Sequence, residues 1–258
     1  MENNLENNLE YNSRFKSAEW ATSPFLTSTY HHIIGLGGIG SHLAFQLART
    51  GITYLYLYDF DKVEIQNVGG QLFATGQLET FKVDATREIL YNFIFQDMYI
   101  IERYDKLSYL PNASYSRVDN EIYFICVDNM ETRSNLAMDF KSKCEFKNFK
   151  GHYFESRLGP TGYELFYVNR DTIDFYLENC LFTDEEANGL TCSFQQTTHV
   201  ASALASDIVS VYTNVITNLS LNRKENMEDF KFVPTPFYIK SDNVLMTKTT
   251  ANVDTWKK

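Results

Sequence analysis

The chain of 258 residues contains little cysteine and little proline, four and five residues respectively. No two cysteines form a Cys-x-x-Cys pair, so we expect no zinc site. So few cysteines favour free thiols in a reducing compartment, which predicts a cytoplasmic location. The four are Cys126, Cys144, Cys180 and Cys192.

Long hydrophobic runs and positive charge are also scarce. The chain contains no run of about 18 apolar residues, so we expect no transmembrane helix. Its polar start, MENNLENNLEYNSR, does not resemble a signal peptide. The chain carries 23 Lys and Arg against 33 Asp and Glu, a net charge of −10. An acidic protein repels phosphate backbones, so we expect neither nucleic-acid nor membrane binding. A local site must hold any bound anion.

Apolar residues are plentiful at 44% of the chain, and aromatic residues make up 15%, enough for a folded core. No stretch is rich in proline, glycine or serine. We therefore expect a lead-in segment over residues 1–28, which is a short helix or disordered, followed by one domain over residues 29–258.

Strands and helices alternate over the first 150 residues. This order predicts an α/β fold with a Rossmann-like, doubly wound sheet that is mainly parallel. The predicted strands cover 31–34, 52–59, 98–104 and 121–128, and the predicted helices run from the glycine turn to Gly51, over about 79–95, and over 130–143.

The pattern changes after about residue 150. Two strands, 151–157 and 162–169, flank a Gly-Pro turn, and an acidic loop over 171–192 follows. Apolar residues at helical spacing then predict a long helix over about 194–217. A hairpin turning at 241–243 completes the chain, so we expect antiparallel strands in this part of the sheet.

The most specific local signal is the glycine turn 35–40, which follows an apolar strand and opens an amphipathic helix. Gly35 permits a tight turn, Gly37 and Gly38 let backbone N–H groups approach a phosphate, and Gly40 allows close packing of helix and strand. Asp59, at the end of the next strand, suits a ribose hydroxyl. The pattern predicts a nucleotide site with a phosphate at the helix N-terminus.

The glycines do not distinguish an ATP site from that of a nicotinamide dehydrogenase, so other residues must decide. Asp61, Asn67, Lys82 and Asp128 are the discriminating set. Each has a plainer interpretation: a turn residue for Asp61 and Asn67, a solvated helix lysine for Lys82, and a helix cap for Asp128.

Four segments together resemble the ThiF/MoeB type of adenylyltransferase, the superfamily that includes ubiquitin-activating enzymes. They are GLGGIGSHLAFQLARTGI, LYDFDKVEIQNVGGQLF, the lysine of LETFKVDATREIL, and ICVDNMETRSNLA. Beyond residue 150 the resemblance is weaker, in ESRLGPTGYELFYVN and LTCSFQQTTHVASALAS. The resemblance implies that ATP and Mg²⁺ are used to convert the C-terminal carboxylate of a ubiquitin-like or sulfur-carrier protein into an acyl-adenylate. It also implies a homodimer.

The resemblance assigns roles by position. Asp59 matches the ribose ligand, Asn67 and Lys82 match contacts to the ATP phosphates, and Asp128 matches the magnesium ligand. Asp61 and Gln71 lie in the same matching segment and are assigned to the nucleotide site. Arg133 matches a family arginine, with support of its loop as the alternative. Adenylation builds negative charge on phosphate oxygens, so it needs a metal and fixed cations rather than a strong base.

One departure from the family pattern concerns position 70, where relatives usually carry an arginine and this chain has Gly70. Either another arginine substitutes or the chain is a weak catalyst. Arg14 is a candidate, because relatives carry an N-terminal arginine that reaches the partner subunit's ATP site. A charge on a disordered tail is the alternative. A catalytically weak or inactive module that binds a nucleotide or a partner therefore remains the second hypothesis.

Cys192 is a candidate thioester nucleophile, because it precedes a predicted helix and some relatives carry such a cysteine in a comparable segment. The acidic residues at 184–186 would oppose a thiolate, and an ordinary loop thiol is the alternative. Cys126, inside an apolar strand, is expected in the core. Arg157, which follows a strand, is a candidate substrate contact or a surface residue.

Overall fold

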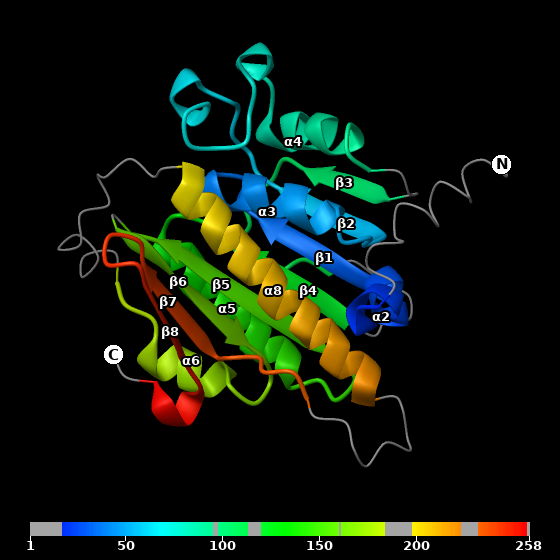
Figure 1. Ribbon diagram of the computed structural model, residues 1–258, viewed down its shortest axis with the longest axis vertical. Coiled ribbons are helices and arrows are strands. Elements are labelled where there is room, and N and C mark those ends of the chain that lie inside the picture. The colour runs from blue at the N-terminus through cyan, green and yellow to red at the C-terminus, as the bar shows by residue number, and fades with distance from the viewer. Residues whose placement is uncertain are drawn as a thin grey trace, which may run out of the picture.

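The computed structural model describes residues 17–94, 98–112, 120–159, 161–183, 198–222 and 232–256. Within these residues a single eight-stranded sheet runs in the order β3-β2-β1-β4-β5-β6-β7-β8 (Figure 1). The strands are β1 (Thr29–Ile34), β2 (Tyr54–Tyr58), β3 (Tyr99–Arg103), β4 (Asn120–Ile125), β5 (Gly151–Leu158), β6 (Gly162–Val168), β7 (Tyr238–Asp242) and β8 (Thr247–Ala251).

The direction of the strands divides the sheet. β3, β2, β1, β4 and β5 are parallel, whereas β6, β7 and β8 are antiparallel. The predicted α/β class, mainly parallel with antiparallel strands in the C-terminal part, is confirmed. Because the order reverses between β1 and β4, the carboxyl ends of these strands open a crevice at the place where doubly wound sheets bind ligands.

Helices cover both faces of the sheet. The helices of the described chain are α2 (Pro24–Ser28), α3 (Gly38–Ala48), α4 (Lys82–Tyr91), α5 (Met130–Cys144), α6 (Ile173–Asn179) and α8 (Thr198–Asn222), with 3₁₀ turns η2 (Glu19–Thr22), η3 (Ile65–Asn67), η4 (Thr75–Gln77) and η5 (Val253–Thr255). α3, α4 and α8 contribute to one hydrophobic core, and α5 and α6 contribute to the core on the opposite face. The central strands are therefore buried on both sides, as expected for parallel strands.

α8 crosses the front of the sheet (Figure 1). By length and composition α8 could span a membrane, because its most apolar window has a mean hydropathy of 1.3. The sequence prediction, which searched only for unbroken apolar runs, did not identify this helix as a candidate. Half of that window is buried inside the protein. Leu204, Ile208 and Val211 lie in the core between the helix and the sheet, which is the burial of a core helix.

Several element boundaries differ from the predictions. The prediction of a loop throughout 171–192 was wrong, because residues 173–179 form α6, where Ile173 and Tyr176 pack into the core beside α5. The helix predicted over 79–95 begins only at Lys82 and ends at Tyr91. Residues 24–28, placed with the lead-in segment, form α2, which packs against α8.

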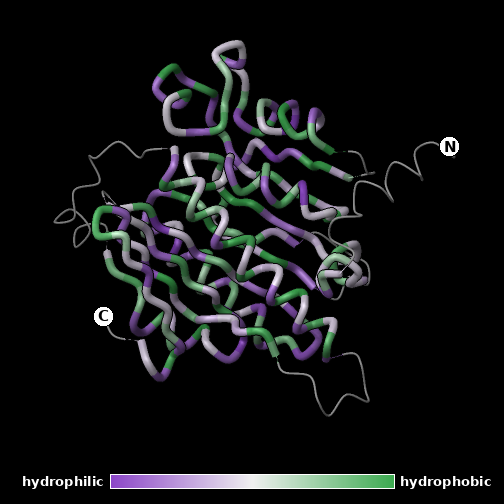
Figure 2. The backbone as a smooth tube through the Cα atoms, in the orientation of Figure 1, coloured by the Kyte–Doolittle hydropathy of each residue, from purple (hydrophilic) through white to green (hydrophobic). Residues whose placement is uncertain are grey.

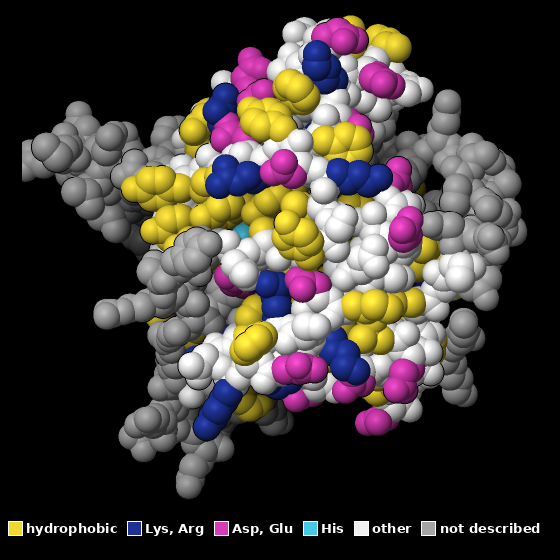
Figure 3. Space-filling view, turned by 180° about the vertical axis from the view of Figure 1, so that it is seen from behind, with side chains coloured by type: hydrophobic (Ala, Val, Ile, Leu, Met, Phe, Trp, Pro, Cys, Tyr) yellow, Lys and Arg dark blue, Asp and Glu magenta, His cyan; other side chains and the backbone are white. Residues whose placement is uncertain are grey.

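The hairpin of β7 and β8 is antiparallel as predicted, but its turn lies at 243–246 rather than 241–243. Val244, Leu245 and Met246 are exposed at this turn, which carries the hydrophobic colour at the left of Figure 2. The face of the molecule opposite α3 and α8 also shows hydrophobic side chains between charged ones (Figure 3).

Candidate nucleotide and carboxylate site

A cavity of about 820 Å³ opens at the carboxyl ends of the parallel strands. Its lining begins at the glycine turn after β1, passes the loops after β2 and β4, and continues to β5, β6 and β7. The cavity therefore extends across the sheet, from the glycine turn at one end to side chains of β5, β6 and β7 at the other. Many of its lining residues are charged, which suits a polar ligand.

The glycine turn is shaped for a ligand at one residue and for packing at two others. A Cβ added to Gly37 would meet no atom within 4 Å, so this part of the turn faces open space. A Cβ on Gly40 would lie 1.9 Å from the Gly35 carbonyl oxygen, and Gly35 has φ of +92° and packs against the Cys126 carbonyl. Glycine at 35 and 40 brings helix and strand together, and glycine at 37 leaves room for a phosphate.

Asp59 follows β2 and holds the turns around it. Its Oδ2 accepts a hydrogen bond from the Leu36 N–H at 2.6 Å, and its Oδ1 accepts one from the Asp61 N–H at 2.8 Å. Burial raises the pKa of this carboxyl, while the Lys82 charge and the two N–H donors act in the opposite direction. The carboxylate lines the cavity at the predicted ribose position and also fixes the glycine turn relative to β2.

Lys82 is the first residue of α4, and only 7% of it is exposed. Its Nζ lies 3.0 Å from Asp61 Oδ2, and the Lys82 N–H donates to the Asp61 carbonyl at 2.9 Å. Both residues line the cavity. The pair thus places one fixed cation at the nucleotide end, and the plainer interpretation of Lys82 as a solvated helix residue does not hold.

The segment after Asp61 contains two predicted site residues, of which one lines the cavity and the other does not. Gln71 lines the cavity, and its Oε1 is buried with no hydrogen-bond partner among the residues that the structure describes. Asn67 does not line the cavity. Its Oδ1 accepts a hydrogen bond from the Glu64 N–H at 2.8 Å and closes the η3 turn. In this structure Asn67 therefore has the turn role that was its alternative interpretation, rather than a phosphate contact.

Asp128 follows β4 and faces the cavity from an exposed position. The helix cap belongs to its neighbour, because Asn129 Oδ1 accepts the Thr132 N–H at 2.8 Å. Asp128 is therefore free of the cap role that was its alternative interpretation. A carboxylate at the end of a strand beside a phosphate turn suits a divalent cation that bridges protein and phosphate.

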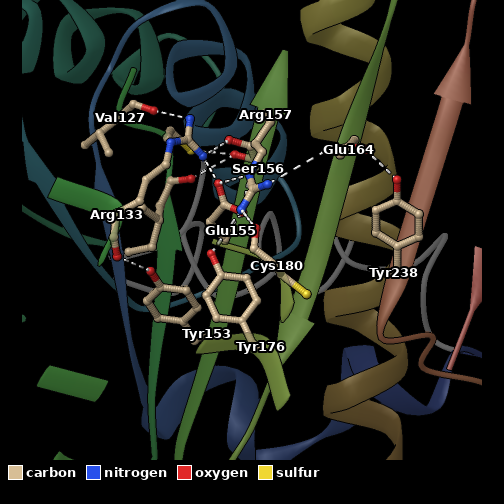
Figure 4. Close-up of polar contacts among 12 residues, drawn as sticks. Val127, Arg133, Tyr153, Glu155, Ser156, Arg157, Glu164, Tyr176, Cys180 and Tyr238 are labelled. Atoms are coloured by element: carbon tan, nitrogen blue, oxygen red, sulfur yellow. Dashed lines mark hydrogen bonds and ion pairs between the residues drawn. The ribbon is translucent and has the colours of Figure 1, made fainter. Parts of the chain in front are cut away.

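Behind Asp128 lies a buried ionic network (Figure 4). Glu155 of β5 is fully buried, forms an ion pair with Arg133 of α5, and lies 2.8 Å from the Nε of Arg157. The Tyr176 hydroxyl donates to the same carboxylate at 3.1 Å. Arg133 also donates to the carbonyls of Val127 and Ser156, so it supports the loop that carries Asp128.

Burial shifts the pKa values of groups in and beside this network. Burial lowers the pKa of Arg133 to about 10, and the nearby Arg157 charge acts in the same direction. One carboxylate serves two guanidinium groups, so the network carries a net positive charge beside the cavity. Cys126, predicted to lie in the core, is buried, and burial raises the pKa of its thiol to about 12.

A family model described as "ThiF family" matches residues 24–223. The chain belongs to the ThiF family. The matched range includes every described element of the site except β7, so the predicted resemblance is confirmed for the nucleotide half and for much of the remainder.

Curated relatives match about half of this ThiF chain. Ubiquitin-like modifier-activating enzyme 5 of Drosophila grimshawi is 34% identical over 135 residues, 48% of this chain and 32% of that protein. The enzyme of the same name from Aedes aegypti is 34% identical over 150 residues, 50% of this chain and 37% of that protein. The match thus spans about a third of the length of these relatives.

Solved structures share the fold over almost the whole chain. PaaA superposes with a TM-score of 0.66 at 14% identity and covers 96% of this chain and 74% of its own. E. coli MccB in complex with ATP gives a TM-score of 0.60 at 15% identity, with 96% and 70% covered. At such identities the likeness concerns the fold alone.

The structure brings most of the predicted residues of this ThiF chain to one cavity. Those that line it are Gly35, Gly37, Gly38, Asp59, Asp61, Gln71, Lys82 and Asp128. Gly40 lies behind the turn, and Asn67 lies away from the cavity. Arg14 and Cys192 lie outside the described residues, so their proposed roles stay predictions.

Two residues of the site were not singled out from the sequence. Glu155 follows two aromatic residues in the predicted strand 151–157, and that position was the available signal, since a charge inside a buried strand needs a partner. Glu164 of β6 lines the far end of the cavity, accepts a hydrogen bond from the Tyr238 hydroxyl at 2.5 Å and lies 3.9 Å from Lys240 Nζ.

Proposed function

We propose that this protein is an ATP-dependent adenylyltransferase that activates the C-terminal carboxylate of a ubiquitin-like protein, a sulfur carrier or a peptide. The observation that carries the proposal is the shared cavity of the open Gly37 turn, Lys82 and Asp128. Relatives are named as activating enzymes of ubiquitin-like modifiers. A likeness of fold to E. coli MccB, which was solved with AMPCPP and MccA, supports a nucleotide next to a peptide.

The residues present fit ATP. The open space at Gly37 and the N–H groups at the start of α3 suit a phosphate. The unpartnered Gln71 Oε1 suits a hydrogen-bond donor of the ligand. Asp59 holds the glycine turn in place and retains lone pairs for ribose hydroxyls.

Asp128 would hold Mg²⁺. The metal ion would neutralise the negative charge on the phosphate oxygens. Lys82, which is only 7% exposed and is held by Asp61, supplies a cation for the phosphates. Arg133 acts through the loop after β4 and keeps Asp128 in position.

The reaction depends on the positions of the substrate carboxylate and the ATP phosphates more than on a general base. A carboxylate oxygen of the substrate forms a bond to the α-phosphorus of ATP, the bond to the pyrophosphate oxygen breaks, and pyrophosphate leaves with that electron pair. A carboxylate is already deprotonated at neutral pH, so no residue has to remove a proton. Transfer of the acyl group to Cys192, a homodimer that supplies Arg14, and a cytoplasmic location are further parts of the proposal.

Two measurements test the proposal. Calorimetry with ATP and Mg²⁺ should show binding that weakens without the metal, and ATP–pyrophosphate exchange should appear with a small protein or peptide that ends in a free Gly-Gly carboxylate. A protein that binds no ATP and supports no exchange would contradict it. Tight NAD binding independent of magnesium would favour a dehydrogenase instead.

A second function is supported by Gly70, which replaces the family's usual arginine. Loss of one such group commonly costs about 2.7–4 kcal/mol in the transition state. The protein would then bind nucleotide and partner but turn over slowly. If Gly70→Arg raises exchange activity by an order of magnitude or more, the weak-catalyst function is favoured, whereas full activity in the unaltered chain excludes it.

A further inference from the structure

The far end of the cavity contains an arginine whose position is set by strand register. Ile34 of β1 pairs with Ile125 of β4, and Ile125 pairs with Glu155 of β5. Arg157 therefore stands two residues beyond the level of Ile34, the last residue of β1, and two strand spacings away from it. Two spacings amount to about 10 Å. A group bound at Arg157 would face the nucleotide end across Asp128.

The Arg157 guanidinium is held firmly on most of its edges. Its Nε lies 2.8 and 3.0 Å from the two oxygens of Glu155, and its Nη2 donates to the Cys180 carbonyl at 3.0 Å. The rings of Phe166 and Phe182 lie 4.7 and 5.0 Å from the guanidinium carbon. Cation–π contacts and charge-assisted hydrogen bonds fix the plane of the group.

One edge of the same group has no hydrogen bond. Among the described residues, Arg157 Nη1 has only an ion pair with Glu164 at 3.9 Å, which is beyond hydrogen-bond distance (Figure 4). The side chain is 11% exposed and lines the cavity. The two N–H donors of Nη1 are therefore available to an acceptor bound in the cavity, and a hydrogen bond from a charged guanidinium is stronger than one between neutral groups.

The neighbouring charges show what kind of acceptor fits. Glu155 is shared between Arg157 and Arg133, so the network around it has one positive charge in excess. Glu164, the other nearby carboxylate, is already engaged by the Tyr238 hydroxyl and by Lys240. A planar group with one negative charge and two oxygens matches the free edge of a guanidinium.

We propose that the Nη1 edge of Arg157 binds the C-terminal carboxylate of the substrate and presents it toward the α-phosphate. This inference rests on the proposed function and names the residue that recognises the acid. Glu155 and Tyr176 hold the guanidinium in place, so Arg157 loses little side-chain freedom when it binds the carboxylate. Once the bond to phosphorus forms, the carboxylate charge is lost and Arg157 releases the product more readily.

The test uses the full chain saturated with AMPCPP and Mg²⁺, which prevents turnover. A short synthetic peptide that ends in Gly-Gly with a free carboxylate is titrated by calorimetry, beside the same peptide with a C-terminal amide. We expect the carboxylate form to bind at least about tenfold more tightly, as charged hydrogen bonds would give. Equal affinity for the two peptides, or binding of neither, would overturn the proposal.

Two variants sharpen the test. Arg157→Lys keeps the charge but removes the planar fork, and should reduce the preference for the carboxylate about tenfold or more while AMPCPP affinity changes little. Arg87→Lys is the matched control, because Arg87 is partly exposed, pairs with Glu102 and lies away from the cavity. An unchanged preference in Arg157→Lys would also overturn the assignment.

Failure of this inference is distinguishable from failure of the proposed function. If AMPCPP and ATP do not bind, the proposed function fails and this inference fails with it. If nucleotide binds and exchange occurs, but the substrate KM is the same in Arg157→Lys and the unaltered chain, only the assignment of Arg157 is wrong. A thermal unfolding curve of Arg157→Lys identifies a folding defect, and the two-peptide comparison in the unaltered chain is independent of it.

Discussion

The two ends of the cavity use different means to hold charged side chains. At the nucleotide end, Asp59, Asp61 and Lys82 come from loops and a helix start, and backbone N–H groups or one partly exposed carboxylate hold them. At the far end, Glu155 and Arg157 come from one strand and are held by side chains from the α5–α6 layer. The first end is held by backbone donors and a half-exposed carboxylate, whereas the second end is held by side chains around a fully buried carboxylate.

This difference teaches which substitutions should affect binding and which should affect folding. At the nucleotide end, Asp59 keeps free lone pairs and the carboxylate paired with Lys82 is half exposed, so loss of a side chain there should mainly remove a ligand contact. A side chain in the Glu155 network is desolvated, so its loss leaves buried charges unpaired. The predictions below test that division, beginning with the largest expected effect.

Glu155→Gln should lower the free energy of unfolding by about 3–5 kcal/mol, because Arg133 and Arg157 would lose the carboxylate they share in a buried place. Urea unfolding followed by circular dichroism measures it. Glu164→Gln is the control, since Glu164 is partly exposed and should cost much less. Similar losses for the two variants would contradict the division between the ends.

Lys82→Met should reduce ATP–pyrophosphate exchange about 10²–10³-fold while leaving unfolding almost unchanged, because it removes a fixed cation from the phosphates. Exchange assays with labelled pyrophosphate check this. Lys62→Met is matched in chemistry, because Lys62 lies over the Phe81 ring outside the cavity. Equal activity in both variants would exclude a phosphate role for Lys82.

Gly40→Ala and Gly37→Ala should separate packing from binding within one turn. At 40 the new Cβ would meet the Gly35 carbonyl, so stability should fall by about 1–3 kcal/mol. At 37 the Cβ has open space, so the protein should fold normally but bind ATP about tenfold more weakly, because the methyl group occupies the phosphate space. Thermal unfolding and calorimetry on both variants measure the two effects, and normal ATP binding by Gly37→Ala would place the phosphate elsewhere.

His31, near the start of β1 and away from the cavity, should make stability depend on pH. It is buried between the Tyr54 carbonyl and the Tyr212 hydroxyl, and burial lowers its pKa to about 4, against about 6.5 in the unfolded chain. Below pH 6.5 the unfolded chain binds a proton that the folded chain does not. The His31 contribution therefore falls by about 2 kcal/mol from pH 7 to pH 5.

Urea unfolding at the two pH values measures this loss. His31→Gln should show a smaller difference between pH 7 and pH 5 than the unaltered chain, whatever its stability at pH 7. His199→Gln is the control, because His199 is exposed on α8. An equal pH difference in the unaltered chain and His31→Gln would contradict the assignment.

Asn67→Ala should have the smallest effect. It removes the hydrogen bond from the Glu64 N–H and should cost about 0.5–1 kcal/mol of stability, without a change in ATP affinity. Differential scanning calorimetry and an ATP titration give both values. A marked loss of ATP affinity would restore the phosphate contact that the resemblance implies for this residue.

Much of the nucleotide end could be predicted from the sequence, because its signals are local. The glycine turn, the acid after β2 and the apolar strand before Asp128 each occupy a few consecutive residues. Strand-end positions gather at one edge of a parallel sheet, so Asp59 and Asp128 could be assigned to one site without coordinates. The assignment of Lys82 to the same site came from the resemblance. Asn67 was harder, because a turn and a phosphate contact use the same amide.

The rest could not be predicted, for reasons of packing. α6 has acidic and amide residues that suit a loop, and only burial of Ile173 and Tyr176 beside α5 stabilises it as a helix. α8 reaches Asn222, beyond the predicted end at about 217, and was not expected to pass a membrane-span test. Arg133, one of the two arginines that pair with Glu155, lies 22 positions away on α5, and such a separation carries no periodic signal in the sequence.

The amino-acid order alone determined the doubly wound sheet, the phosphate turn and the ThiF resemblance, because each follows from spacing along a few residues or from short segments in a fixed order. Tertiary structure alone decided that Asn67 closes a turn, that Glu155 sits between two arginines, and that one edge of Arg157 faces the cavity. Those facts depend on which helices cover which face of the sheet. Burial then fixes the energy of each charge, and burial is a property of the assembled layers rather than of any single segment.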